Sequence, residues 1–114
     1  MSEIEEKITE LQFLEQNLQN FLMQKQDMQI ELNEIDRAII ETEKTNDDVY
    51  KMVGGIIIKA EKNLLLEELQ EKKKIQELKL ESLKKQENFL LEKVKKLRSE
   101  ITGNISKKDE GTKR

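Results

Sequence analysis

The side chains that most often carry out chemistry in proteins are scarce in this chain of 114 residues. It has no histidine and no cysteine, although Asp and Glu together number 24. Without histidine, the commonest general base and metal ligand at neutral pH is missing. Without cysteine, there is no thiolate nucleophile, thiolate metal site or disulfide framework. Most of the carboxylates fit solvent-exposed helix positions, so we expect no catalytic residue, no metal site and no cofactor.

The overall composition favours long helices over a globular core. Charged residues make up 39% of the chain, aromatic residues only 4%, and there is no proline. Chains rich in Glu, Lys, Leu and Gln are typical of coiled coils. Intrinsic disorder is the competing interpretation of such a composition, but an ordered heptad pattern argues against it.

The charge and hydropathy of the chain indicate whether it binds nucleic acid or spans a membrane. A net charge of -3 argues against binding to nucleic acid, because phosphate contacts need clustered Lys and Arg. No apolar run approaches the roughly 18 residues needed to span a bilayer. The acidic first residues also lack the features of a signal peptide. We therefore expect a soluble, cytoplasmic protein that does not bind membranes.

The first arm of the chain, residues 1–44, carries a heptad pattern without a stutter. Nine of its twelve a and d positions are apolar, which predicts a coiled-coil seam. The exceptions are Lys7, Lys25 and Thr42. The a positions are Ile4, Leu11, Leu18, Lys25, Leu32 and Ile39, and the d positions are Lys7, Leu14, Phe21, Met28, Ile35 and Thr42.

The second arm, residues 63–103, carries the complementary pattern. Eight of its eleven seam positions are apolar, and Lys73, Gln76 and Glu87 interrupt them. The seam positions are Leu66, Leu69, Lys73, Gln76, Leu80, Leu83, Glu87, Leu90, Val94, Leu97 and Ile101. Asn63 suits the N-cap of this helix, and Gly103-Asn104 suits its C-terminal stop. Residues 104–114 lose the heptad, and we expect this tail to be disordered.

Four apolar residues fall outside the a and d positions. Phe13, Met23, Phe89 and Leu91 could widen the apolar stripe or form additional contacts to a partner. We expect them to widen the stripe, because single exposed apolar residues are normal on protein surfaces.

The segment between the arms, residues 45–62, breaks the helical pattern. Polar residues 45–48 end the first helix, and β-branched and aromatic residues then bracket Gly54-Gly55. This pattern predicts a tight β-hairpin, because glycine tolerates the positive φ angles of primed turns. Three consecutive isoleucines suit a strand that is buried on both faces. An isolated hairpin is barely stable and its open edges invite aggregation, so we expect its strands to pair with other subunits. The expected assembly residues are Val49, Tyr50, Met52, Val53, Gly54, Gly55, Ile56, Ile57 and Ile58.

The predicted fold is therefore mainly α, with a long antiparallel coiled-coil hairpin and a central β-hairpin in a single domain, residues 1–114. This order of elements, with Val-Tyr-Lys-x-Val-Gly at residues 49–54, closely resembles a prefoldin subunit. Residues 22–26, followed by Leu32 and Ile35, resemble the first helix of that family, and residues 66–73 resemble the start of its second helix. The resemblance covers roughly residues 4 to 102. The single hairpin resembles the β class, either the archaeal β subunit or related eukaryotic subunits.

This resemblance implies a function and a set of partners. It implies a hexamer of two α-class and four β-class subunits, in which the hairpins form β-barrels. It also implies a holdase that captures non-native client proteins without ATP and delivers them to a group II chaperonin. The client site would lie at the ends of the arms, where coiled coils fray. The expected client-binding residues are Ile4, Ile8, Leu11, Leu97, Ile101 and Ile105.

Two other functions compete with this interpretation. A generic coiled-coil scaffold or adaptor explains the arms but does not need the glycine-centred hairpin. A helical-hairpin arm that binds RNA would need a basic tip, whereas this junction carries Asp47 and Asp48.

Overall fold

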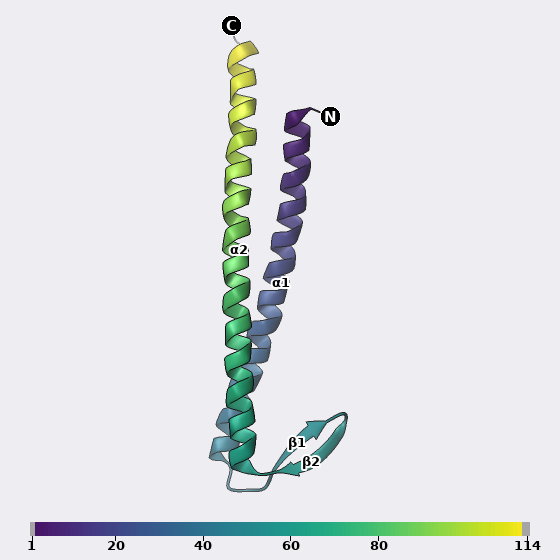
Figure 1. Cartoon of the computed structure of the whole chain (residues 1–114), viewed down its shortest axis with the longest axis vertical. Helices are drawn as coiled ribbons and strands as arrows, with labels where there is room; N and C mark the ends of the chain where they lie inside the picture. The colour runs from purple at the N-terminus through teal and green to yellow at the C-terminus, as the bar shows by residue number, and fades with distance from the viewer. Residues whose placement is uncertain (1, 113–114) are drawn as a thin grey trace. The chain divides into compact units, whose positions relative to one another are not determined.

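The computed structural model describes the backbone of residues 2–112 and the side chains of residues 2–103. The elements follow in the order α1 (Glu3–Lys44), β1 (Val49–Val53), β2 (Ile56–Ala60) and α2 (Lys62–Thr112) (Figure 1). Two long helices with an antiparallel hairpin between them confirm the predicted mainly helical fold. The chain divides into two compact units. We call residues 26–82 the hairpin unit, and the segments up to residue 25 and from residue 83 the terminal unit.

The buried side chains confirm the predicted heptad register. Every a and d position predicted for the two arms is buried or half-buried. The most buried apolar residue is Val94, which is 2% exposed, and Leu32 and Ile39 are each 6% exposed. Burial at a 3.5-residue spacing is the pattern of a coiled-coil seam, in which each helix covers the apolar stripe of the other.

In the hairpin unit, α1 and α2 are joined by an ion pair. The Lys73 ammonium lies 2.8 Å from the Asp36 carboxylate. The hydrogen bond and the negative charge of Asp36 raise the pKa of Lys73 above its ordinary value. Lys73, which interrupts the apolar seam in the sequence, therefore has an acidic partner on the facing helix.

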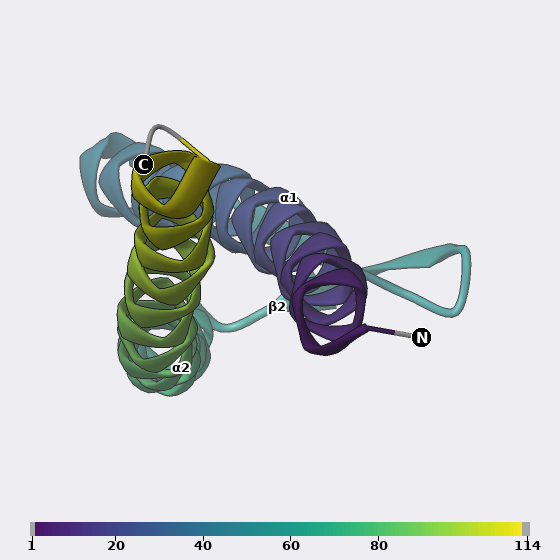
Figure 2. The same ribbon diagram turned by 90° about the horizontal axis from the view of Figure 1, so that it is seen from above.

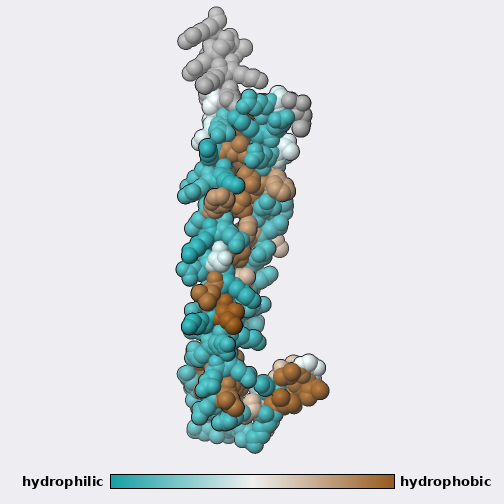
Figure 3. Space-filling model, in the orientation of Figure 1, coloured by the Kyte–Doolittle hydropathy of each residue, from teal (hydrophilic) through white to brown (hydrophobic). Residues whose placement is uncertain are grey.

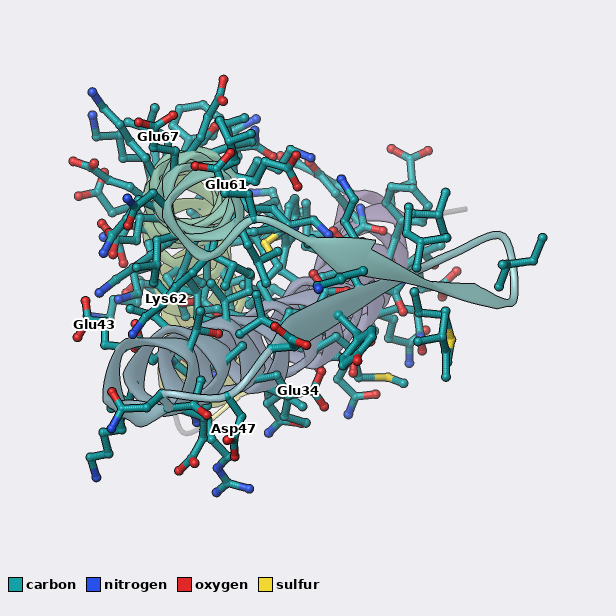
Figure 4. All side chains as sticks on the ribbon, turned by 90° about the horizontal axis from the view of Figure 1, so that it is seen from below. Glu34, Glu43, Asp47, Glu61, Lys62 and Glu67 are labelled. Atoms are coloured by element: carbon teal, nitrogen blue, oxygen red, sulfur yellow. The ribbon has the colours of Figure 1, made fainter. Side chains whose placement is uncertain are left out.

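The start of α2 stabilises the end of α1. The Lys62 ammonium donates hydrogen bonds to the backbone carbonyls of Thr45 at 2.8 Å and Glu43 at 3.2 Å. Viewed from below in Figure 4, Lys62 extends toward the last turn of α1, next to Glu43. The last carbonyls of a helix have no partner within it and carry partial negative charge, so a lysine is a favourable cap.

Both predicted ends of the second helix are wrong. The helix begins at Lys62, and the Leu65 amide donates to the Glu61 carbonyl at 2.9 Å, so Asn63 lies inside the first turn and is not the cap. At the other end, the helix continues through Gly103 to Thr112. Among the described residues, only Gly54 and Gly55 have positive φ, so Gly103 does not adopt the left-handed conformation that ends a helix.

In the terminal unit, the first part of α1 and the last part of α2 lie side by side and run antiparallel (Figures 1 and 2). Three interhelical ion pairs show the direction, because the partner number falls as the number along α1 rises. They are Lys7–Glu100 at 3.5 Å, Glu15–Arg98 at 2.6 Å and Lys25–Glu87 at 2.8 Å.

The hairpin has the register that a two-residue loop imposes. Val53 pairs with Ile56, and the pairing continues to Val49 opposite Ala60. The loop residues Gly54 and Gly55 have φ angles of 55° and 81°. Positive φ at both loop positions defines a type I′ turn, whose twist matches that of the flanking strands. The predicted hairpin is therefore confirmed.

Candidate functional site

The β-hairpin exposes apolar side chains on both of its faces. Because side chains alternate along a strand, Met52 and Ile57 share one face, and Val53 and Ile56 share the other. Met52, Ile57 and Ile56 are 69%, 65% and 66% exposed, and Val53 is 54% exposed. In Figure 3 the hairpin is the most continuous hydrophobic area of the visible surface. Apolar residues gathered in this way mark an interaction surface.

The other predicted assembly residues lie closer to the helices or within the turn. Tyr50 is 56% exposed and Ile58 is 42% exposed, whereas Val49 is half-buried. Gly54 and Gly55 form the turn, and no heavy atom would lie within 4 Å of a Cβ added at either one. The structure therefore brings all nine predicted residues together on one hairpin.

The backbone of the hairpin also has groups available for pairing. The sheet has only two strands within residues 2–112, so each strand has an edge without a strand partner. In a two-residue hairpin the residues next to the turn exchange hydrogen bonds, and the following pair points its backbone groups outward. Met52 and Ile57 form that outward-facing pair. The hairpin thus offers both apolar side chains and strand edges to another chain.

The β1 strand of the hairpin lies near the start of α2. The Lys51 ammonium lies 3.2 Å from the Glu68 carboxylate. Lys51, Met52 and Val53 also line a hollow of about 430 Å³ together with α2 side chains that include Leu65 and Ile75. The hairpin is therefore oriented by α2 and is not an isolated ribbon.

The terminal unit contains the predicted client-binding residues in two different environments. Leu97 and Ile101 are 7% and 8% exposed within the seam, and Ile4 and Leu11 are half-buried. Ile8 is 39% exposed and flanks the seam. The Ile105 side chain lies outside the described residues. In the closed seam, Ile8 is the most accessible of the described candidates, and Leu97 and Ile101 become available only if the helices separate.

Sequence reasoning missed the contact between Lys25 and Glu87. The two residues interrupt the seam separately in the sequence, yet the Lys25 ammonium donates a 2.8 Å hydrogen bond to the Glu87 carboxylate. Their opposite charges were a usable signal, because polar residues in a coiled-coil seam tend to meet one another and define its register.

The four apolar residues that we predicted to widen the apolar stripe are exposed in the structure: Phe13, Met23, Phe89 and Leu91. Phe13, Met23 and Phe89 are 66%, 63% and 60% exposed, and Leu91 is 40% exposed. Two helices cover only the a and d positions and part of the flanking positions, so residues further around each helix stay in solvent. These four residues are available to a partner.

Two other features, a metal-binding cluster and a membrane-spanning helix, are absent from the described residues. Within them, no group of three or more acidic side chains could hold a metal ion. None of the helices, over the residues searched, is long and apolar enough to cross a membrane.

Comparison with known proteins identifies the family to which this chain belongs. Residues 5–108 match the family model described as prefoldin subunit. The chain belongs to the prefoldin family. The prefoldin subunit beta of Pyrobaculum islandicum is 41% identical over 92 residues, which is 79% of this chain and 74% of that protein. The prefoldin subunit beta of Pyrococcus furiosus is 39% identical over 101 residues, covering 87% of this chain and 86% of that protein.

A solved prefoldin structure has the same fold. The crystal structure of the prefoldin beta subunit from Thermococcus strain KS-1 matches with a TM-score of 0.85 and 35% sequence identity. The match covers 91% of this chain and 93% of that subunit. The predicted resemblance to β-class prefoldin subunits is therefore confirmed, and with it the role of a chaperone subunit that assembles with other prefoldin subunits.

Proposed function

We propose that this chain is a β-class subunit of a cytoplasmic, ATP-independent holdase. Two α-class and four β-class subunits would assemble through their hairpins, and the ends of the coiled coils would capture non-native proteins for a group II chaperonin. Catalysis and bound cofactors have no part in this mechanism.

The exposed hairpin is the observation that carries the proposal. Met52, Ile56 and Ile57 are each about two-thirds exposed in the single chain. Burying apolar surface stabilises by about 25 cal/mol per Å², and pairing the strand edges adds backbone hydrogen bonds. Assembly therefore removes a surface that would otherwise promote aggregation.

The terminal unit supports a capture site that binds each client weakly. Ile8 offers an exposed apolar side chain, and opening of the seam would add Leu97 and Ile101. Each such contact contributes little, so binding would depend on several arms acting on one client at once. Weak, multiple contacts also permit transfer to a chaperonin without nucleotide hydrolysis.

The proposed capture site is tested by replacing apolar residues near the N-terminus. The double variant Ile4→Gln, Ile8→Gln keeps helix propensity and chain length while it removes apolar surface. We expect the variant to assemble normally with a two-hairpin α-class subunit. It should suppress the aggregation of a chemically unfolded model protein several-fold less well, because the apolar contacts of two isoleucines with the client are lost. Native mass spectrometry and light scattering measure the two properties.

The matched control is the double variant Ile30→Gln, Ile40→Gln. These isoleucines are exposed on α1 like Ile8, at 56% and 47%, but belong to the hairpin unit. Full protection by the control and reduced protection by the first variant support the proposed site. Equal protection by both variants means that clients bind elsewhere.

A further inference from the structure

A second apolar site lies within the terminal unit, between the two helices. Phe21 of α1 and Phe89 and Leu90 of α2 line a hollow of about 460 Å³, with Lys85 and Gln86 at its margin. Phe89 is 60% exposed, whereas Phe21 is half-buried. The two rings thus form an open apolar surface, in which the Phe21 ring is half-buried and the Phe89 ring is accessible to a partner.

Two lysines lie next to the apolar lining of this hollow. Lys85 lines it, and the Lys93 ammonium lies 4.6 Å from the centroid of the Phe89 ring. That distance is within the range of a cation–π interaction, which holds the ammonium beside the exposed ring.

Few acidic residues lie close to either phenylalanine in the sequence. The four residues on either side of Phe21 include none. Within the same span around Phe89, Glu87 is already paired with Lys25, and Glu92 is the other acid. The hollow therefore combines an apolar lining with two neighbouring lysines, and Glu92 is the one acid in these two spans for which no ion pair is seen.

We propose that this hollow is a client subsite that accepts an aromatic or aliphatic side chain flanked by acidic residues. The apolar side chain would pack between Phe21 and Phe89, and neighbouring carboxylates would contact Lys85 and Lys93. The proposal rests on the holdase function proposed above and names the kind of client segment that one arm prefers. The exposed Phe89 ring then has a partner, which the coiled-coil seam does not provide.

The test uses the full-length chain assembled with a two-hairpin α-class subunit and a short fluorescent peptide. The peptide has a central Phe-Leu pair with Asp on both sides, and a second peptide carries Lys in place of Asp. Fluorescence anisotropy should show the acidic peptide binding about threefold more tightly than the basic one, because exposed charge pairs contribute little. The variant Phe89→Gln should weaken binding of the acidic peptide about tenfold, since most of the accessible ring is lost.

Two further variants make the test specific. Phe13→Gln removes a phenylalanine that is 66% exposed but does not line the hollow, so it should bind the peptide like the wild-type chain. The double variant Lys85→Glu, Lys93→Glu should reverse the preference between the two peptides. Circular dichroism and native mass spectrometry check that each variant remains helical and assembled.

The outcomes separate this proposal from the function on which it rests. If the wild-type complex suppresses aggregation but Phe89→Gln binds the peptide as well as the wild-type chain does, the subsite is wrong and the holdase function stands. Equal losses from Phe13→Gln and Phe89→Gln would also overturn the subsite, because any exposed phenylalanine would then serve. A wild-type complex that neither binds the peptide nor suppresses aggregation overturns both proposals.

Discussion

Lys25 and Glu87 are two charged residues in a seam that is otherwise largely apolar. Their side chains are 28% and 14% exposed, and their charged atoms are 2.8 Å apart. Removing charges from water is costly, so such a pair adds little net stability compared with apolar residues of similar size. It does define one alignment of the helices, because a slip of either helix would leave both charges without a partner.

The variant Lys25→Met should therefore destabilise the coiled coil more than the double variant Lys25→Met, Glu87→Leu. We expect the single variant to lose about 1–3 kcal/mol, because it leaves the Glu87 carboxylate partly buried without its partner. The double variant should match or exceed the wild-type stability. Urea unfolding followed by circular dichroism, at one protein concentration, measures both free energies of unfolding.

The Arg98–Glu15 pair provides the control for this cycle. Its atoms are as close, at 2.6 Å, but its side chains are 60% and 42% exposed. Arg98→Met should change the stability by less than about 1 kcal/mol, as is usual for surface ion pairs. A similar loss for Lys25→Met would show that burial of the seam pair has no energetic effect.

At the scale of elements, the hairpin depends on the conformation of its turn more than on the space around it. Gly54 has a φ of 55°, and no heavy atom would lie within 4 Å of a Cβ added there. A Cβ at this position thus meets no steric obstacle, and the penalty comes from the left-handed backbone. That penalty is largest for β-branched residues and small for asparagine.

Gly54→Val should therefore weaken the hairpin, whereas Gly54→Asn should preserve it. The left-handed conformation costs an ordinary residue roughly 1–2 kcal/mol, and Asn-Gly is a preferred type I′ loop. We expect a smaller fraction of assembled subunits for the valine variant in native mass spectrometry at low concentration. Equal assembly of the two variants would show that the turn adopts another conformation in the complex.

At the scale of the whole molecule, the helices can bury their apolar residues within one chain, whereas the hairpin needs another subunit to do so. The helices bury their own seam residues, including Val94 and Leu97, within one chain. The hairpin leaves Met52 and Ile57 exposed in that chain. Folding of the helices should therefore be separable from assembly of the subunits.

Ile57→Asp should abolish assembly and leave the helical content largely intact. A charge on the exposed face of the strand would have to be buried without a partner when hairpins associate. Ile30→Asp is the matched control, because Ile30 is 56% exposed on a helix compared with 65% for Ile57. Native mass spectrometry and circular dichroism report assembly and helicity. A complex of wild-type mass from Ile57→Asp would exclude the hairpin as the assembly element.

The features that the sequence alone determined are those that follow from local patterns of residues. A 3.5-residue repeat places a and d residues on one stripe, so the seam register could be read without knowing the partner helix. The Gly54-Gly55 loop likewise determined the strand register, because a two-residue turn permits only one pairing of its flanks. The nine hairpin residues of the candidate site followed from that register.

The tertiary structure decided what depends on contacts between distant residues. Lys25 meets Glu87 and Lys62 caps α1 because the antiparallel packing within each unit brings those residues together. The exposure of Phe89 follows from the narrow area that one helix covers on another, which the heptad pattern does not specify. Gly103 continues the helix because its backbone does not adopt the left-handed conformation, and glycine permits both choices. Sequence periodicity thus determines which face a residue occupies, and packing determines whether that face is covered.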